Sequence, residues 1–180
     1  MGHCLAQELN KAGARVTVLE GPVTQPFRLK AVRTKKFHYY REFWGLLKKE
    51  LKKNFDIIVH AAAVADYQLK KPYTAKLRSG RKDLRLSLVP TERLINKIKV
   101  ISPDSFLVGF KLESTINKKN LKAKISDLFH KARCDLVVAN HLKNTYYTGY
   151  IINRQNQILA YAQSRKDLAR QLVKAISEQV

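Results

Sequence analysis

An aspartate that directly follows a run of small residues is the most specific chemical feature of this sequence. Residues 61–65 read Ala-Ala-Ala-Val-Ala, and Asp66 comes next. Small side chains let a ligand lie directly on the backbone, and a carboxylate accepts hydrogen bonds from a sugar hydroxyl or a base amine while repelling phosphate. We therefore expect Asp66 to bind the neutral part of a nucleotide. The alternative is an aspartate that caps a helix or lies solvated in a loop.

The residues before the alanine run predict how Asp66 is positioned. Residues 56–60 read Asp-Ile-Ile-Val-His, a β-branched run without polar alternation. Such a run favours a strand buried on both faces of a parallel sheet. Open parallel sheets bind ligands at the carboxyl ends of their strands. The alanine run and Asp66 are thus expected at the ligand-binding edge.

A basic segment follows Asp66 and is predicted to form a flap over residues 68–86. It is rich in Lys, Arg, Gly, Ser and Pro and has no helical period. Its cations are Lys70, Lys71, Lys76, Arg78, Arg81 and Lys82. A mobile loop of this charge can close over a triphosphate and neutralise it. A solvated, disordered insertion is an equal alternative on charge alone.

The overall charge indicates an anionic partner or substrate. Of the 180 residues, 35 are Lys or Arg and 14 are Asp or Glu, which gives a net charge of +21. The basic residues extend from Lys11 to Lys174 and do not gather in one tail or patch, so nucleic acid is an unlikely main partner.

Cys4 and Cys134 lie in no metal-ligand spacing, and neither a metal site nor a disulfide is predicted. No apolar stretch has the length of a membrane span, so we expect a cytoplasmic protein with no membrane partner.

The remaining pattern predicts alternating helices and strands around a mainly parallel sheet. Helices are expected over residues 1–12, 39–53, 91–100 with Thr91 as N-cap, 118–132, and from Ser164 onward. Strands are expected over residues 15–19, 27–34, 56–60, 83–89, 106–110 and 135–140, with a β-hairpin over 146–161. We predict an α/β, Rossmann-like fold with flanking helices, a basic flap and a C-terminal hairpin. Residues 1–180 are expected to form one domain.

Four strand ends in this order resemble one enzyme family. They read AAAVADY over residues 61–67, Lys76-Leu77, VGFKLE over 108–113, and DLVVAN over 135–140. In order and spacing they resemble phosphopantothenoylcysteine synthetase, the ligase of coenzyme A biosynthesis. The resemblance implies that the carboxylate of 4'-phosphopantothenate attacks the α-phosphate of CTP and releases pyrophosphate. The amine of L-cysteine then displaces CMP. CTP, or ATP in its place, acts with Mg²⁺ as a co-substrate.

The resemblance also implies roles for individual residues. Lys76 matches the catalytic flap lysine, and Asp66 and Phe110 match positions that hold the cytidine. Ala63 matches a position that presents backbone to the bound intermediate, and Asn140 lies at the rim of the same crevice. Lys124 and Lys131 are the nearest counterparts of a lysine pair that binds the nucleotide. Gly2 matches the end of a substrate-binding Ser-Ser-Gly-x-Met-Gly segment.

The sequence departs from the family pattern at two places. Residues 90–94 read Pro-Thr-Glu-Arg-Leu where bacterial relatives carry Pro-Asp-Ile. Residues 110–113 read Phe-Lys-Leu-Glu and look more like the monofunctional synthetases, which include animal enzymes that can use ATP, so the choice between CTP and ATP is open. The match of Met1-Gly2 implies that the family's first strand, glycine-rich loop and asparagine come before this position. The alternative function is therefore a catalytically impaired nucleotide- or RNA-binding module of the same fold. An NAD(P)-binding domain is disfavoured because no GxGxxG is present. The resemblance implies a homodimer, with the hairpin over 146–161 as an interface element.

Overall fold

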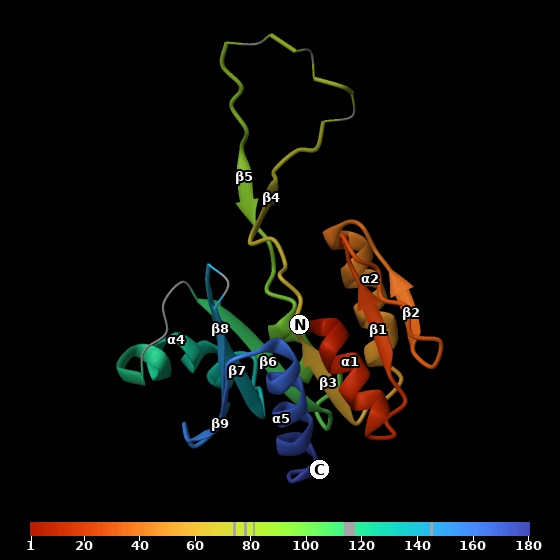
Figure 1. The fold of residues 1–180 in the computed structure, drawn as a ribbon. Coiled ribbons are helices and arrows are strands. Elements are labelled where there is room, and N and C mark those ends of the chain that lie inside the picture. The colour runs from red at the N-terminus through yellow and green to blue at the C-terminus, as the bar shows by residue number, and fades with distance from the viewer. Residues whose placement is uncertain (74, 78, 81, 114–117, 145) are drawn as a thin grey trace.

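A five-stranded sheet forms the centre of the molecule, and helices cover both of its faces (Figure 1). The computed structural model describes residues 1–73, 75–77, 79–80, 82–113, 118–144 and 146–180. Its helices are α1 Gly2–Lys11, α2 Tyr40–Leu51, α3 Ile95–Ile101, α4 Lys118–His130 and α5 Arg165–Ser177. Its strands are β1 Thr17–Glu20, β2 Arg33–Lys36, β3 Ile57–His60, β4 Tyr67–Leu69, β5 Leu88–Pro90, β6 Phe106–Glu113, β7 Leu136–Lys143, β8 Tyr146–Asn153 and β9 Ile158–Ala162.

The strands form three separate sheets. The central sheet has the order β3-β6-β7-β8-β9, in which β3, β6 and β7 are parallel and the last two strands are antiparallel to their neighbours. Strands β1 and β2 form a parallel pair, and β4 and β5 form an antiparallel pair. The predicted α/β, Rossmann-like fold with a C-terminal hairpin is confirmed.

Two large hydrophobic clusters lie on opposite faces of the central sheet. One joins α2, α3 and α4 to the sheet and includes Leu47, Ile98 and Ile125. The other joins α1 and α5 to the sheet and includes Leu5 and Leu172. Strands β6 and β7 each contribute fully buried side chains to both clusters. This burial matches the continuous apolar runs of their sequences.

The predicted strand over residues 27–34 is wrong for most of its length. The observed strand β2 begins at Arg33, and the residues before it form a turn in which the Val32 N–H donates to the Leu29 carbonyl over 3.0 Å. The Phe27 N–H donates to Glu20 Oε1 over 2.6 Å, and Phe27 and Val32 pack in a small cluster with Ala6 of α1. These side chains are buried by a helix rather than by sheet pairing.

Two further predictions around the flap are wrong. The strand predicted over residues 83–89 is reduced to β5, because Leu84 and Leu86 extend from the body and remain 48% and 49% exposed. The helix predicted from residue 91 begins at Ile95, with Leu94 as N-cap. Thr91 does not cap it, because its groups bond to the segment that follows β3.

Candidate functional site at the carboxyl edge of the sheet

The alanine run lies at the carboxyl end of β3 and exposes its backbone. Ala62, Ala63 and Ala65 are exposed, whereas Val64 turns inward and packs against the cluster that contains α2. A single apolar anchor therefore holds an otherwise open segment in place. Ala63 is thus exposed at the edge where the sequence predicts a binding floor, and its contact with a ligand stays a prediction.

Asp66 lies between this floor and a long arm. Its side chain is exposed, and its carbonyl oxygen accepts a hydrogen bond from the Thr91 N–H over 2.9 Å. The Thr91 hydroxyl donates to the carbonyl of Ala65. The Tyr40 hydroxyl, at the start of α2, donates to the Glu92 carbonyl over 2.9 Å. These bonds attach the position of Asp66 to the body of the protein.

The arm consists of β4, β5 and the segment between them. It stands away from the body in Figure 1. Lys76 is exposed in the distal segment of the arm, so this structure does not bring it to Asp66. A hollow of about 760 Å³ on the arm is lined by Leu69, Lys70, Lys71, Pro72, Tyr73, Arg85 and Ser87. The arm thus carries a concentration of positive charge, as predicted for the flap. Arg78 and Arg81 lie outside the described residues.

Phe110 and Asn140 lie near the carboxyl ends of β6 and β7. Phe110 pairs in register with Val138, two residues before Asn140, and packs on the cluster that contains α1 and α5. Because alternate residues of a strand share a face, Asn140 projects to the same side as Phe110. Both are half-buried.

Gly2 is the first residue of α1, on the same face of the sheet. It is exposed, and a Cβ built on it would have no atom within 4 Å. The N-cap residue Met1 makes no side-chain cap hydrogen bond, and the positive end of the α1 dipole at this turn favours an anion. Gly2, Phe110 and Asn140 thus lie on one face of the sheet.

The opposite face of this edge carries a cationic network around Glu113. Lys124 of α4 donates to Glu113 Oε2 over 2.7 Å, and Lys111 Nζ lies 3.4 Å from Oε1. The bond from Lys124, followed by that from Lys111, holds the pKa of Glu113 below its ordinary value of 4.5. His141 Nδ1 lies 3.0 Å from the Glu113 carbonyl oxygen. The network fixes Lys124 close to the binding edge.

Lys131 does not lie beside Lys124 at the carboxyl edge of the sheet. Helix α4 leaves the carboxyl end of β6 and returns to the amino end of β7, and seven residues of helix span about 10 Å. Lys131 follows the end of α4 and pairs with Asp127 over 3.0 Å. The structure therefore places Lys131 toward the opposite edge of the sheet, away from the other predicted site residues.

Sequence reasoning missed Thr91, Tyr40 and His141. Thr91 looked like an N-cap because it follows proline and precedes an apolar run, and nothing in the local pattern indicated a bond to Ala65. Tyr40 and His141 act through contacts with main-chain atoms 52 and 28 residues away. Local spacing carries no signal for partners at such separations.

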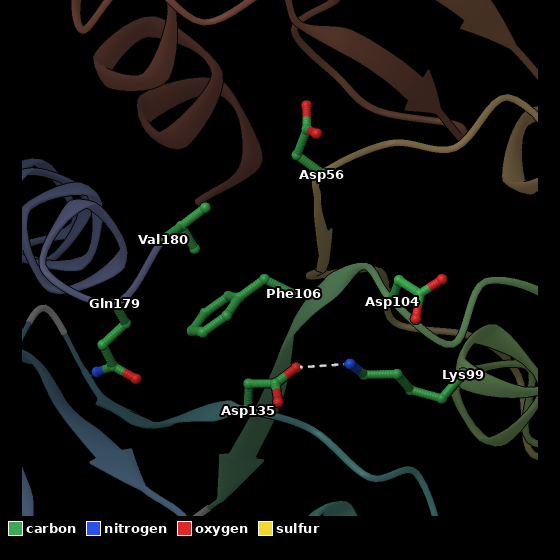
Figure 2. A pocket seen from close by; sticks show the side chains of 7 residues that line it. All are labelled: Asp56, Lys99, Asp104, Phe106, Asp135, Gln179 and Val180. Atoms are coloured by element: carbon green, nitrogen blue, oxygen red, sulfur yellow. Dashed lines mark ion pairs between the residues drawn. The ribbon is translucent and has the colours of Figure 1, made fainter.

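A cavity of about 320 Å³ lies at the other, amino edge of the sheet (Figure 2). Two of its charged residues pair with each other, since Lys99 Nζ lies 2.9 Å from Asp135, and Arg154 lies 3.0 Å from the same carboxylate. Asp135 also accepts the Leu107 N–H over 2.8 Å. These bonds align the starts of β6 and β7, and we assign the cavity a structural role.

Two further observations concern the described residues as a whole. Among them, no group of three or more His, Cys, Asp and Glu side chains is arranged to hold a metal ion. None of the helices they form has the length and apolar character needed to cross a lipid bilayer.

Comparison with known protein families gives a match along the whole chain. Residues 1–180 match the family described as DNA/pantothenate metabolism flavoprotein C-terminal domain. A coenzyme A biosynthesis bifunctional protein CoaBC from Thermococcus kodakarensis is 35% identical over 144 residues, which are 79% of this chain and 35% of the relative. The CoaBC protein of Borreliella burgdorferi is 31% identical over 191 residues, covering 98% of this chain and 45% of the relative. The chain thus spans less than half the length of these curated relatives.

Solved structures confirm the fold. The DNA/pantothenate metabolism flavoprotein from Streptococcus pneumoniae superimposes with a TM-score of 0.86 at 19% identity, covering 99% of this chain and 87% of that one. The C-terminal domain of a CoaBC protein gives a TM-score of 0.77 at 20% identity, covering 99% and 81%. A Cab2 mutant in complex with phosphopantothenate-cysteine gives 0.65 at 18% identity, covering 83% and 53%.

Proposed function

The chain belongs to the DNA/pantothenate metabolism flavoprotein C-terminal domain family, and from this premise we propose that it is the ligase of coenzyme A biosynthesis that joins 4'-phosphopantothenate to L-cysteine. The observation that carries the proposal is Asp66, placed directly after an exposed alanine floor at the carboxyl end of β3. The CoaBC relatives and the phosphopantothenate-cysteine complex of a structural neighbour support the substrate class.

The reaction needs a carboxylate to acquire a good leaving group. In the first step a carboxylate oxygen of 4'-phosphopantothenate attacks the α-phosphorus of the nucleoside triphosphate, and the bond to the bridging oxygen breaks to release pyrophosphate. In the second step the amine nitrogen of L-cysteine attacks the acyl carbon. The nucleoside monophosphate leaves, and the nitrogen loses a proton as the amide forms. Negative charge develops on the phosphates in the first step, so cations at that position accelerate it.

We assign some of the site residues to the nucleotide and the others to 4'-phosphopantothenate. Asp66 accepts hydrogen bonds from the nucleoside, the Phe110 ring packs beside the base, and the main chain at Ala63 contacts the acyl-nucleotide. Lys124 contributes positive charge at the edge. Asn140 and the first turn of α1 at Gly2 bind the phosphopantothenate portion. CTP is the proposed co-substrate, with ATP as its alternative and Mg²⁺ on its phosphates.

Lys76 completes the site by a motion of the arm. We assign it to the phosphates that leave as pyrophosphate. In the extended arrangement it is solvated, so the proposal includes closure of the arm about its base at Asp66 and Thr91. We also propose a homodimer, for which the β8–β9 hairpin supplies exposed apolar side chains at Ile158, Leu159 and Tyr161.

Pyrophosphate release that requires both 4'-phosphopantothenate and L-cysteine tests the proposal, measured with CTP and ATP in parallel. Asp66→Asn should weaken nucleotide binding about 5- to 150-fold, because replacing an acceptor in a desolvated site costs ~1–3 kcal/mol. Asp104→Asn is the matched control, since Asp104 is exposed at the amino edge. Equal nucleotide affinities of the Asp66→Asn and Asp104→Asn variants would show that Asp66 is only a solvated or capping loop residue.

The charge of +21 and the cationic arm favour one second function, a nucleotide- or RNA-binding module without chemistry. Its signature is retention of a labelled nucleotide or RNA without substrate-dependent pyrophosphate release. The same assay therefore separates the two functions.

A further inference from the structure

A histidine and a buried carboxylate bond to each other at the carboxyl edge of the sheet. His3 lies in the first turn of α1, directly after Gly2, and its Nε2 lies 3.3 Å from Oε1 of Glu20. Glu20 is the last residue of β1, and its side chain is only 4% exposed. We call these two residues the His3–Glu20 pair. Neither belongs to the sequence motifs that identify the family.

Contacts with the segment after β1 fix the orientation of the pair. The Phe27 N–H donates to Oε1 of Glu20 over 2.6 Å, so the same oxygen accepts from a main-chain group and from the imidazole. Hydrogen bonds of this kind offset the cost of burying a carboxylate. The ring of Phe27 also packs on the imidazole of His3, with ring centroids 5.1 Å apart. His3 is therefore held both by a carboxylate and by an aromatic ring.

The bond to Glu20 determines which nitrogen of His3 can accept a proton. An ionised carboxylate only accepts hydrogen bonds, so Nε2 of His3 carries the hydrogen that is donated to Glu20. In the neutral imidazole the free lone pair is then on Nδ1. Among the described residues no group bonds to Nδ1, and the His3 side chain is 39% exposed. A carboxylate that fixes the tautomer in this way prepares the second nitrogen to act as a general base.

The pair lies on the face of the sheet that α1 covers. Val18, two residues before Glu20 on β1, packs in the small cluster that joins β1 to α1. Because alternate residues of a strand share a face, Glu20 projects toward α1 as well. Phe110 packs on the cluster that contains α1, and the start of this helix lies near the base of the arm (Figure 1). His3 therefore borders the position at Gly2 that we assign to 4'-phosphopantothenate.

The other four histidines of the chain lack this combination of orientation and access. His60 has a buried Nε2 and lies beside Phe43 of α2, on the other face of the sheet. His141 also lies on that other face, where its Nδ1 contacts a main-chain carbonyl oxygen. His38 and His130 are exposed, and in the described part of the chain no carboxylate bonds to either ring.

We propose that His3 accepts the proton of the L-cysteine amine in the second step, and that Glu20 positions His3 to do so. This inference rests on the proposed ligase function. The amine nitrogen forms a bond to the acyl carbon, and the bond from that carbon to the oxygen of the nucleoside monophosphate breaks. The proton moves from the nitrogen to Nδ1 of His3. The carboxylate of Glu20 stabilises the resulting imidazolium, which then releases the proton to water.

The experiment measures the two steps separately. The first step is followed as the pyrophosphate released in a single turnover without L-cysteine. The second is followed as the amide formed when L-cysteine is added to the acyl-nucleotide on the enzyme. His3→Gln is the main variant, because its amide can still donate to Glu20 but cannot accept a proton. We expect the second step to slow about 10²- to 10⁴-fold, the usual loss when a general base is removed, while the first step keeps its wild-type rate.

His38→Gln is the matched control, since this exposed imidazole has no carboxylate partner in the described part of the chain, and it should retain both rates. Glu20→Gln should also slow only the second step. Combining it with His3→Gln should cause no further slowing, because Glu20 acts through His3. Imidazole added to His3→Ala should restore part of the second-step rate, which it would not do for a histidine with a merely structural role.

The outcomes distinguish this inference from the ligase proposal. A His3→Gln variant that couples L-cysteine at the wild-type rate would overturn the role of His3 and leave the ligase proposal intact. Equal slowing of both steps, without rescue of His3→Ala by imidazole, would also overturn it by showing a structural role. A wild-type chain that releases no pyrophosphate with 4'-phosphopantothenate would overturn the ligase proposal, and this inference with it.

Discussion

Thr91 holds Asp66 through its main chain, because the Thr91 N–H donates to the Asp66 carbonyl over 2.9 Å while its hydroxyl donates to Ala65. The two residues lie at the base of the arm, on its two sides. Any motion of the arm therefore acts on the segment that we assign to nucleotide binding. Thr91 is a positioning residue in this proposal, since it acts through Asp66.

Replacing the Thr91 hydroxyl tests this link. Thr91→Val keeps the size of the side chain and removes one hydrogen bond, which contributes ~0.5–1.5 kcal/mol. We expect the KM for the nucleotide to rise about 2- to 12-fold with a smaller change in kcat. Thr91→Ser keeps the hydroxyl and should restore the KM. A KM unchanged by valine would show that the main-chain bond alone positions Asp66.

Lys76→Ala is expected to reduce kcat by ~10²-fold or more, because it removes a cation from phosphates on which charge develops. The melting temperature should not change, since Lys76 is exposed in the distal segment of the arm. Lys82→Ala, on the same arm and also exposed, is the matched control and should retain most of the activity. Equal activity of the two variants would leave Lys76 with no role beyond the general charge of the arm.

His60 makes stability depend on pH. Burial lowers the pKa of His60 from 6.5 to about 4, and among the described side chains its Nε2 is a buried nitrogen without a hydrogen-bond partner. The unfolded chain then binds the proton more tightly, so stability falls as pH drops from 6.5 toward 4. Between pH 7 and pH 5 the loss in free energy of unfolding is roughly 2 kcal/mol.

Chemical denaturation at pH 7 and pH 5 measures this loss. His60→Leu should remove most of it, because a leucine cannot bind the proton that the unfolded state gains. His130→Leu, at an exposed histidine, should leave it in place. An identical pH dependence in wild type and His60→Leu would contradict the assignment to His60.

Two glycines should respond in opposite ways to alanine. A Cβ at Gly109 in β6 would lie 2.7 Å from Cys134 Sγ and 3.2 Å from Ile95 Cδ1, so Gly109→Ala should destabilise the core by ~1–3 kcal/mol. A Cβ at Gly45 in α2 would meet no atom within 4 Å, and Gly45→Ala should stabilise the helix by ~0.5–1 kcal/mol. Thermal unfolding of both variants measures the two shifts. A melting temperature that Gly109→Ala also raises would show that the packing around Gly109 relaxes to admit the methyl group.

Local pattern determined most of the helices and strands. The helical spacing of the apolar residues predicts α2, which runs over Tyr40–Leu51, and Ser164 caps α5 by accepting the Asp167 N–H over 3.1 Å. The unalternated run before the alanines predicts β3, and the order of the strand ends identifies the family. The helices and strands depend on residues within about one turn or one strand of each other, and the family match depends on the order of motifs along the chain, so a linear sequence contains both.

Tertiary structure alone decided which of the candidate residues lie together. Lys124 and Lys131 look equivalent in sequence, but α4 crosses from one edge of the sheet to the other and separates them. Thr91 has the sequence context of a helix cap, yet Ala65 and Asp66 bind it. The pairing of β1 with β2, and of β3 with β6, likewise depends on contacts far apart along the chain. Such contacts form only when packing brings distant segments together, and local spacing does not encode them.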